Sequence, residues 1–166
     1  MTVRNSDEPG HQDHMAMTAA WRAAVVGLGA ASPNPAVGAV VVAGERILAT
    51  GSHRRAGLEH AEVDALRQAG DQARGSTVYV TLEPCHHIGR QPACTDALIR
   101  AGVRQVVYGI DDPDLRCAGR GAQALTRAGI EVRSGPLADA CRALNPGYLH
   151  RQRTGELTPR HALLQA

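Results

Sequence analysis

Two short segments of the 166-residue chain carry side chains that together suit metal binding and proton transfer. The first is His60-Ala61-Glu62, and the second runs from Glu83-Pro84-Cys85 across eight residues to Cys94. One imidazole and two thiolates form a donor set that suits Zn²⁺. Three protein ligands leave the fourth position of a tetrahedral ion open, which is typical of a catalytic zinc site rather than a structural one.

Glu62 is expected to act beside the metal and not as a ligand. On a helix, positions i and i+2 point about 200° apart, so His60 and Glu62 can share a pocket only where the backbone turns at a helix N-terminus. Zinc deaminases combine His/Cys/Cys ligands with a separate Glu that moves protons. Their signature has two residues between the cysteines, whereas eight separate them here. We therefore expect the loop 86–93 to lie close to the metal.

Each segment alone has an ordinary structural explanation. A His-x-Glu on a helix is commonly a solvated pair, and two cysteines nine positions apart are commonly core residues. Their occurrence together, with Thr81-Leu82-Glu83-Pro84 leading Cys85 off a predicted strand, favours zinc. Cys94 also falls at the start of a predicted helix, where the helix dipole favours a thiolate.

The motifs in combination resemble the riboflavin-pathway deaminases of the cytidine deaminase superfamily. The residues that carry the resemblance are Asn34-Pro35-x-Val37-Gly38, His60-Ala61-Glu62-Val63, Thr81-Leu82-Glu83-Pro84-Cys85 and Gly89-Arg90-x-Pro92-x-Cys94. It extends over roughly 13–155 and implies a three-layer α/β/α sandwich around a mixed five-stranded sheet. It also implies Zn²⁺ bound by His60, Cys85 and Cys94, with Glu62 as proton shuttle in the hydrolytic deamination of an aminopyrimidine.

The same resemblance implies substrate contacts for five further residues. Asn34 would hold the ring, while His53 and His87 would lie near the ring or ribose. Arg90 takes a position suited to the substrate phosphate, because a guanidinium matches phosphate geometry. Asp112 would contact the ribityl or ribose part. Family likeness also suggests a homodimer or higher homo-oligomer.

The sequence departs from this family in two places. The family loop Asp-Pro-Asn-Pro is here Asp112-Pro113-Asp114-Leu115, followed by Arg116-Cys117. Asp114 thus replaces an amide with a carboxylate that only accepts hydrogen bonds, and we expect it to repel a phosphate or select another group. The likeness ends near Gly155, where the family's reductase half would begin, so a separate reductase is an expected partner.

Three other functions are consistent with parts of the pattern. A paralogous deaminase of a related heterocycle would fit the altered loop at Asp114. A non-catalytic, zinc-stabilised binding module would need no proton shuttle, so Glu62 argues against it. An RNA-editing deaminase is disfavoured by the net charge of only +2 and by the spacing of the cysteines.

Alternating patterns of apolar residues predict the elements that position these motifs. The predicted helices span 13–29, 59–69, 93–101, 121–128 and 136–144, the last of these being the final helix of the chain. The predicted strands span 37–43, 46–52, 77–82, 103–110 and 130–133. A hairpin followed by alternating helices and strands indicates an α/β fold with a mixed sheet between helices.

Composition excludes several classes of protein. All 18 basic residues are Arg, so the chain offers no Lys for a Schiff base or a Walker-type phosphate loop. The longest apolar run, 36–43, is too short to span a bilayer. Residues 1–12 lack an apolar signal-peptide core, so we expect a cytoplasmic protein with reduced thiols. We expect a flexible tail over 1–12, one deaminase domain over 13–155 and a second tail over 156–166.

Overall fold

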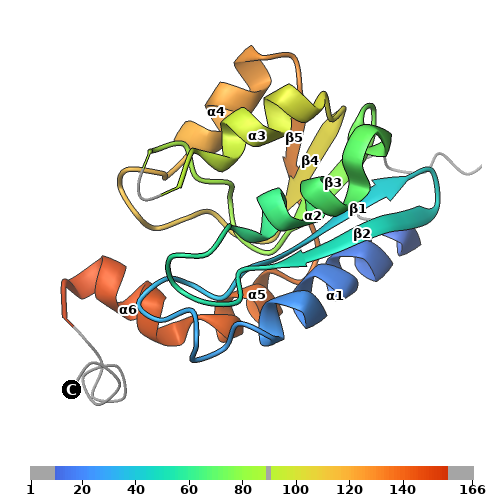
Figure 1. Ribbon diagram of the computed structural model, residues 1–166. Helices are drawn as coiled ribbons and strands as arrows, with labels where there is room; N and C mark the ends of the chain where they lie inside the picture. Colours follow the sequence, from blue (N-terminus) through green and yellow to red (C-terminus); the bar gives the residue numbers. More distant parts are fainter. Residues whose placement is uncertain (1–9, 89–90, 157–166) are drawn as a thin grey trace, which may run out of the picture.

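A computed structural model of the protein describes residues 10–88 and 91–156. A helix comes first, then a β-hairpin, and then helices and strands in alternation (Figure 1). The elements are α1 (His11–Val25), β1 (Gly38–Ala43), β2 (Arg46–Ser52), α2 (Ala61–Ala69), the 3₁₀ turn η1 (Gly70–Ala73), β3 (Thr77–Val80), α3 (Cys94–Ala101), β4 (Gln105–Tyr108), α4 (Arg120–Arg127), β5 (Glu131–Ser134), α5 (Ala138–Leu144) and α6 (Pro146–Thr154).

The sheet has five strands in the order β2-β1-β3-β4-β5. β1 runs antiparallel to β2 and β3, whereas β3, β4 and β5 are parallel to one another. α1 and α5 cover one face, and α2, α3 and α4 cover the other (Figure 1). The predicted three-layer sandwich around a mixed five-stranded sheet is therefore confirmed.

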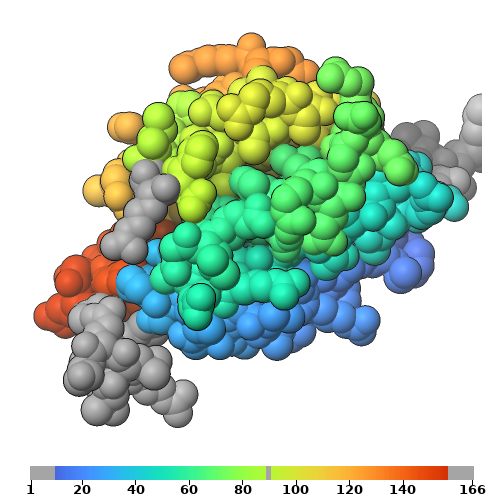
Figure 2. Space-filling view, viewed as in Figure 1, coloured from blue at the N-terminus to red at the C-terminus, as the bar shows by residue number. Residues whose placement is uncertain are grey.

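The core lies on both faces of the central strands. Val40, Val41, Val78, Val106 and Val107 are all fully buried, as expected for strands that are apolar on both sides. On the face shown in Figure 2, α2 (green) fills the surface between α1 (blue) and the α3 and α4 segments (yellow and orange). No helix in the described part of the chain is long and apolar enough to cross a membrane.

Several predicted helix boundaries differ from the structure, and the first helix both begins and ends earlier than the predicted span 13–29. α1 begins at His11 after an N-cap at Gly10, so Asp13, the first residue of the predicted helix, lies within the first turn. Asp13 still serves the helix start, because the Gly10 N–H donates to its Oδ2 at 3.2 Å. The prediction that the chain's last helix is 136–144 was wrong, since α6 follows it. Pro146 is the first residue of α6, where a missing backbone N–H costs nothing.

Asp13 also ties α1 to the sheet, and its loss should destabilise the fold. Its Oδ1 accepts a hydrogen bond from the Tyr79 hydroxyl at 2.6 Å and one from Arg133 at 2.8 Å. Asp13→Ala leaves the buried Tyr79 hydroxyl unpaired, so we expect the free energy of unfolding to fall by about 2–4 kcal/mol. Urea denaturation measures this. Asp139→Ala is the control, because Asp139 is fully exposed and pairs only with the largely exposed Arg142. Equal effects of the two variants would contradict the assignment.

Candidate functional site

Three potential metal ligands converge between α2, α3 and the segment after β3. The His60 Nδ1 and the Sγ atoms of Cys85 and Cys94 all lie within 4.8 Å of one another. The His60 Nδ1 is 3.1 Å from the Cys94 Sγ and 3.6 Å from the Cys85 Sγ. All four cysteines of the chain are free. One imidazole nitrogen and two sulfurs at these separations fit a tetrahedral zinc ion.

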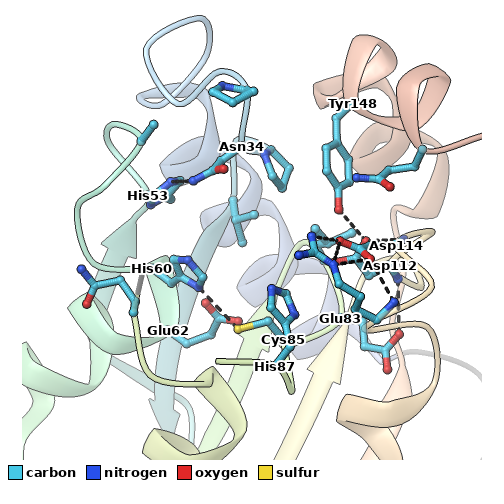
Figure 3. A pocket seen from close by; sticks show the side chains of 18 of the residues that line it. Asn34, His53, His60, Glu62, Glu83, Cys85, His87, Asp112, Asp114 and Tyr148 are labelled. Atoms are coloured by element: carbon cyan, nitrogen blue, oxygen red, sulfur yellow. Dashed lines mark hydrogen bonds and ion pairs between the residues drawn. The ribbon is translucent and has the colours of Figure 1, made fainter. Parts of the chain in front are cut away.

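The position of His60 explains how it and Glu62 reach the same pocket. His60 is the N-cap of α2 with extended backbone angles, φ −74° and ψ 160°, and is not part of the helix as predicted. Glu62 is the second helical residue, and both side chains point into the cavity (Figure 3). A Cβ at Gly51 would collide with the Ala61 carbonyl oxygen, so glycine lets α2 begin directly against β2.

Hydrogen bonding between Cys85 and Cys94 shifts the pKa values of their thiols in opposite directions. The Cys94 backbone N–H donates to the Cys85 Sγ at 3.3 Å. A hydrogen bond from the Cys94 thiol lowers the pKa of Cys85, and His60 adds to the effect. The pKa of Cys94 is raised, because its thiol donates that bond and is buried. Cys85 is therefore the more acidic of the two thiols, and a bound divalent cation would favour the thiolate form of both.

Glu62 lies beside the ligand set in a nearly dry environment. Its residue is 3% exposed, and its side chain contacts that of Cys94. Burial, followed by the charge of Cys85, raises the pKa of Glu62 to about 7. A carboxyl group with a pKa near the working pH is suited to both accept and return a proton.

The candidate site opens into a cavity of about 430 Å³. His60, Glu62 and Cys85 lie on one side of it, and Asp112, Asp114 and Tyr148 lie on the other (Figure 3). The cavity is large enough for a drug-sized heterocycle and its substituent.

Asn34 and His53 form a hydrogen-bonded pair at the cavity wall. The His53 Nδ1 is 3.0 Å from the Glu59 carbonyl oxygen, so it must carry the proton and donate it. The His53 Nε2 then accepts from the Asn34 Nδ2 at 3.2 Å. Burial lowers the pKa of His53, which favours this neutral form. The arrangement leaves the Asn34 side-chain oxygen to accept a hydrogen bond from a ligand.

Asp112 faces the cavity from the opposite wall. Its Oδ1 accepts hydrogen bonds from the Tyr148 hydroxyl at 2.7 Å and the Asp114 N–H at 3.0 Å. Burial raises the pKa of Asp112. Sequence reasoning missed Tyr148 because it belongs to α6, the helix that was not predicted.

Asp114 lines the cavity, but its oxygens are already occupied. Arg116 donates from Nε to Oδ1 at 3.0 Å and from Nη2 to Oδ2 at 2.5 Å. The Arg116 backbone N–H also donates to Oδ1 at 2.9 Å. These bonds lower the pKa of Asp114, so it is a carboxylate, but a neutralised one. The expected repulsion of an anion by Asp114 therefore does not follow.

The loops around the site are held by a buried carboxylate that sequence reasoning did not single out. Glu83 accepts backbone hydrogen bonds from Asp112 at 3.3 Å, Gly119 at 3.1 Å and Ala122 at 3.2 Å. A Cβ at Gly121 would collide with the Pro84 carbonyl oxygen. Glu83 is thus a support that fixes the Asp112 loop and the start of α4 against the Cys85 segment.

A second support joins the two walls of the cavity. The Asn145 side chain accepts from the Ala36 N–H at 2.7 Å and donates to the Ala36 carbonyl at 2.8 Å. Arg151 of α6 donates to the Pro33 carbonyl at 2.7 Å. These bonds fasten the Asn34 turn to the start of α6.

The remaining two predicted substrate contacts are in the Cys85–Cys94 loop. His87 lines the cavity, and its Nδ1 lies 3.0 Å from the buried Cys117 Sγ. Arg90 lies outside the described residues. Of the described residues of this loop, His87 and Gln91 both line the cavity.

Comparisons with known proteins agree with this geometry. The family described as the cytidine and deoxycytidylate deaminase zinc-binding region matches residues 11–110. The riboflavin biosynthesis protein RibD of Escherichia coli is 50% identical over 144 residues, which are 87% of this chain and 39% of that protein. A diaminohydroxyphosphoribosylamino-pyrimidine deaminase of Buchnera aphidicola is 40% identical, and the match covers 87% of this chain and 98% of that one.

Solved structures show the same fold in longer chains. RibD of Acinetobacter baumannii superposes with a TM-score of 0.84 at 49% identity, covering 87% of this chain and 41% of that one. A diaminohydroxyphosphoribosylaminopyrimidine deaminase/5-amino-6-(5-phosphoribosylamino)uracil reductase of Thermotoga maritima has a TM-score of 0.82 at 39% identity, covering 42% of that chain. The present chain thus spans about two-fifths of these two structures.

Proposed function

The chain belongs to the cytidine and deoxycytidylate deaminase family, and on that premise we propose that it deaminates an aminopyrimidine by hydrolysis. The substrate proposed is the diaminohydroxyphosphoribosylaminopyrimidine named for its Buchnera aphidicola relative. The observation that carries the proposal is a His/Cys/Cys ligand set with a buried carboxylate, Glu62, beside it. A purely structural metal site has no use for such a carboxylate.

Zn²⁺ is the proposed cofactor, with the His60 Nδ1, the Cys85 Sγ and the Cys94 Sγ as its ligands. The donor set fits, because two sulfurs and one imidazole nitrogen are ligands that zinc prefers and these atoms lie within 4.8 Å of one another. When bound, zinc lowers the pKa of water to about 7 and supplies a nucleophile at neutral pH.

Glu62 is the proposed catalytic residue. Its carboxylate takes the proton released by the attacking water and carries it to the ring nitrogen. It then takes the remaining proton of the new hydroxyl group on the ring carbon and delivers it to the departing amine, so that ammonia leaves and a ring carbonyl remains. Burial supports this cycle, since it excludes bulk water and keeps the pKa of the carboxyl group close to neutrality.

The two cavity walls are proposed to hold the rest of the substrate. The Asn34 oxygen, oriented through His53, accepts a hydrogen bond from a ring N–H or amine. Asp112 accepts from a ribose hydroxyl with the oxygen that Tyr148 does not use. His87 and Arg90 are proposed to contact the substrate as well. The deaminase domain is proposed to span 13–155.

Two partners are proposed. A reductase that consumes the deaminated product is one, because the name of the Thermotoga maritima relative pairs these two activities. A second copy of the chain, forming a homodimer or larger assembly, is the other.

Ammonia release from candidate substrates tests the proposed function. Purified, zinc-loaded protein is assayed with the phosphoribosylaminopyrimidine, its dephosphorylated form, cytosine, cytidine and guanine. We expect turnover of the first compound with the highest kcat/KM. Turnover of another heterocycle alone would instead support the paralogous deaminase that the Asp114 loop suggests. Zinc binding without ammonia release from any compound would contradict the proposal.

A further inference from the structure

The loop 112–118 brings a fixed guanidinium to the cavity wall opposite the metal ligands. Asp114 is 7% exposed, and it holds Arg116 through Nε, Nη2 and the backbone N–H. The Arg116 side chain is 68% exposed and lines the cavity. Because Nε and Nη2, which form one edge of the guanidinium, are both bonded to one buried carboxylate, the plane of the group is set before any ligand arrives.

Part of the guanidinium stays available to a ligand. Among the described residues, the hydrogen bonds of the Arg116 side chain use Nε and Nη2 and leave Nη1 without a partner. An ion pair this exposed on the Arg side adds little to stability. The pair is therefore better explained by the guanidinium that it presents to the cavity than by a contribution to the stability of the fold.

The position of Arg116 indicates which part of a ligand it meets. The reacting ring carbon must lie near Glu62 and the metal ligands, so the substituent of the ring extends to the opposite wall. That wall offers Asp112, an acceptor for hydroxyl groups, followed two residues later by Asp114 with its bound Arg116. A hydroxylated substituent that ends in an anion matches this order of groups.

We propose that Arg116, held in place by Asp114, binds the phosphate of the substrate and gives this chain its preference for a phosphorylated pyrimidine. Asp114 acts as a positioning residue and does not touch the substrate. The family's amide at this position can donate hydrogen bonds, whereas the Asp114 carboxylate cannot. Arg116, which is bound to Asp114, supplies hydrogen-bond donors in its place. This inference rests on the proposed function, whose substrate carries the phosphate.

Binding of phosphorylated and dephosphorylated substrate tests the role of Arg116. Titration calorimetry is performed on zinc-loaded protein carrying Glu62→Gln to prevent turnover. Arg116→Gln is expected to raise the Kd of the phosphorylated compound about 10- to 100-fold, the range for a lost charge-assisted hydrogen bond. The Kd of the dephosphorylated compound should change less than about twofold. Arg127→Gln removes the same charge from the exposed end of α4 and should change neither value.

Asp114→Asn separates positioning from direct contact. We expect this variant alone to raise the Kd of the phosphorylated compound about 3- to 10-fold, because Arg116 loses its ionic anchor. In the Arg116→Gln background it should instead lower the Kd, since an unpaired carboxylate facing the phosphate is removed. If the pair were merely structural, Asp114→Asn would shift the Kd of both compounds alike and would have the same sign of effect in both backgrounds. That result would overturn the inference.

The two proposals fail in different ways. Phosphate-dependent binding that needs Arg116, without ammonia release by the unmodified protein, would contradict the proposed function and leave the inference supported. Ammonia release with equal Kd values for both compounds would overturn the inference and leave the proposed function standing.

Discussion

Glu62→Gln is expected to lower kcat for ammonia release by about 10³-fold or more, at the upper end of what a positioned proton carrier contributes. Gln has nearly the same shape but takes up no proton, so the attacking water is not activated and the amine is not protonated. The zinc content should stay unchanged, because Glu62 is not among the three converging ligands. Ammonia assays and metal analysis on the same preparation measure both quantities.

Glu45→Gln is the matched control, because Glu45 is exposed in the turn between β1 and β2. It should retain both zinc and activity. If Glu62→Gln released ammonia at the wild-type rate, Glu62 would not be the proton carrier. Loss of zinc from Glu62→Gln would show that the carboxylate is a ligand or holds the ligand set together.

Cys94→Ala is expected to abolish both zinc binding and activity. Cys94 is fully buried at the first turn of α3, and its thiol is hydrogen-bonded to Cys85. Without it, only two ligands remain. A ligand present at 1,000 times its dissociation constant stabilises a fold by about 4 kcal/mol, so the melting temperature should fall by several degrees and no longer respond to added zinc.

Cys141→Ala controls for the loss of a buried thiol. Cys141 is 1% exposed and lies in α5, away from the ligand set. It should lower the melting temperature through lost packing but keep zinc and the zinc-dependent rise in melting temperature. Cys94→Ala protein with full zinc content, or Cys141→Ala protein without zinc, would contradict the ligand assignment.

Most of the fold follows from local patterns that the sequence displays. The hairpin is predicted to the residue in β2, because two apolar segments are separated only by the two residues Gly44-Glu45, which form the turn. α2 and α3 end at residues 69 and 101 as predicted, and each is capped by a glycine, Gly70 or Gly102. α6 was missed because Asn145-Pro146-Gly147 has the composition of a turn, although proline is favoured at the first position of a helix.

The grouping of His60, Cys85 and Cys94 was predictable because their spacing and residue types repeat a known chemistry. The exact place of His60 was not, since apolar periodicity does not distinguish an N-cap from the first helical turn. Tyr148 was out of reach for a different reason: it meets Asp112 from 36 positions away in the chain. Such a contact depends on packing and not on a local pattern.

Asp114 shows a different limit. The prediction that Asp114 repels an anion considers its charge alone and not its ion pair with Arg116, two residues later. The Asp114–Arg116 pair is local, and the tendency of Asp to bond the backbone two residues on is a known turn signal. The exposure of Arg116 to the cavity, however, depends on the position of the loop, which Glu83 fixes through bonds to its backbone.

The most direct test of the central claim is the fate of oxygen when the zinc-loaded protein acts on the phosphoribosylaminopyrimidine in water enriched in heavy oxygen. Hydrolysis assisted by Glu62 places one solvent oxygen on the ring carbon for each ammonia released. We therefore predict a product that carries the heavy isotope in equal amount to the ammonia, and no product from zinc-stripped protein. Ammonia released without incorporation of solvent oxygen, or released at the same rate after zinc removal, would contradict the account.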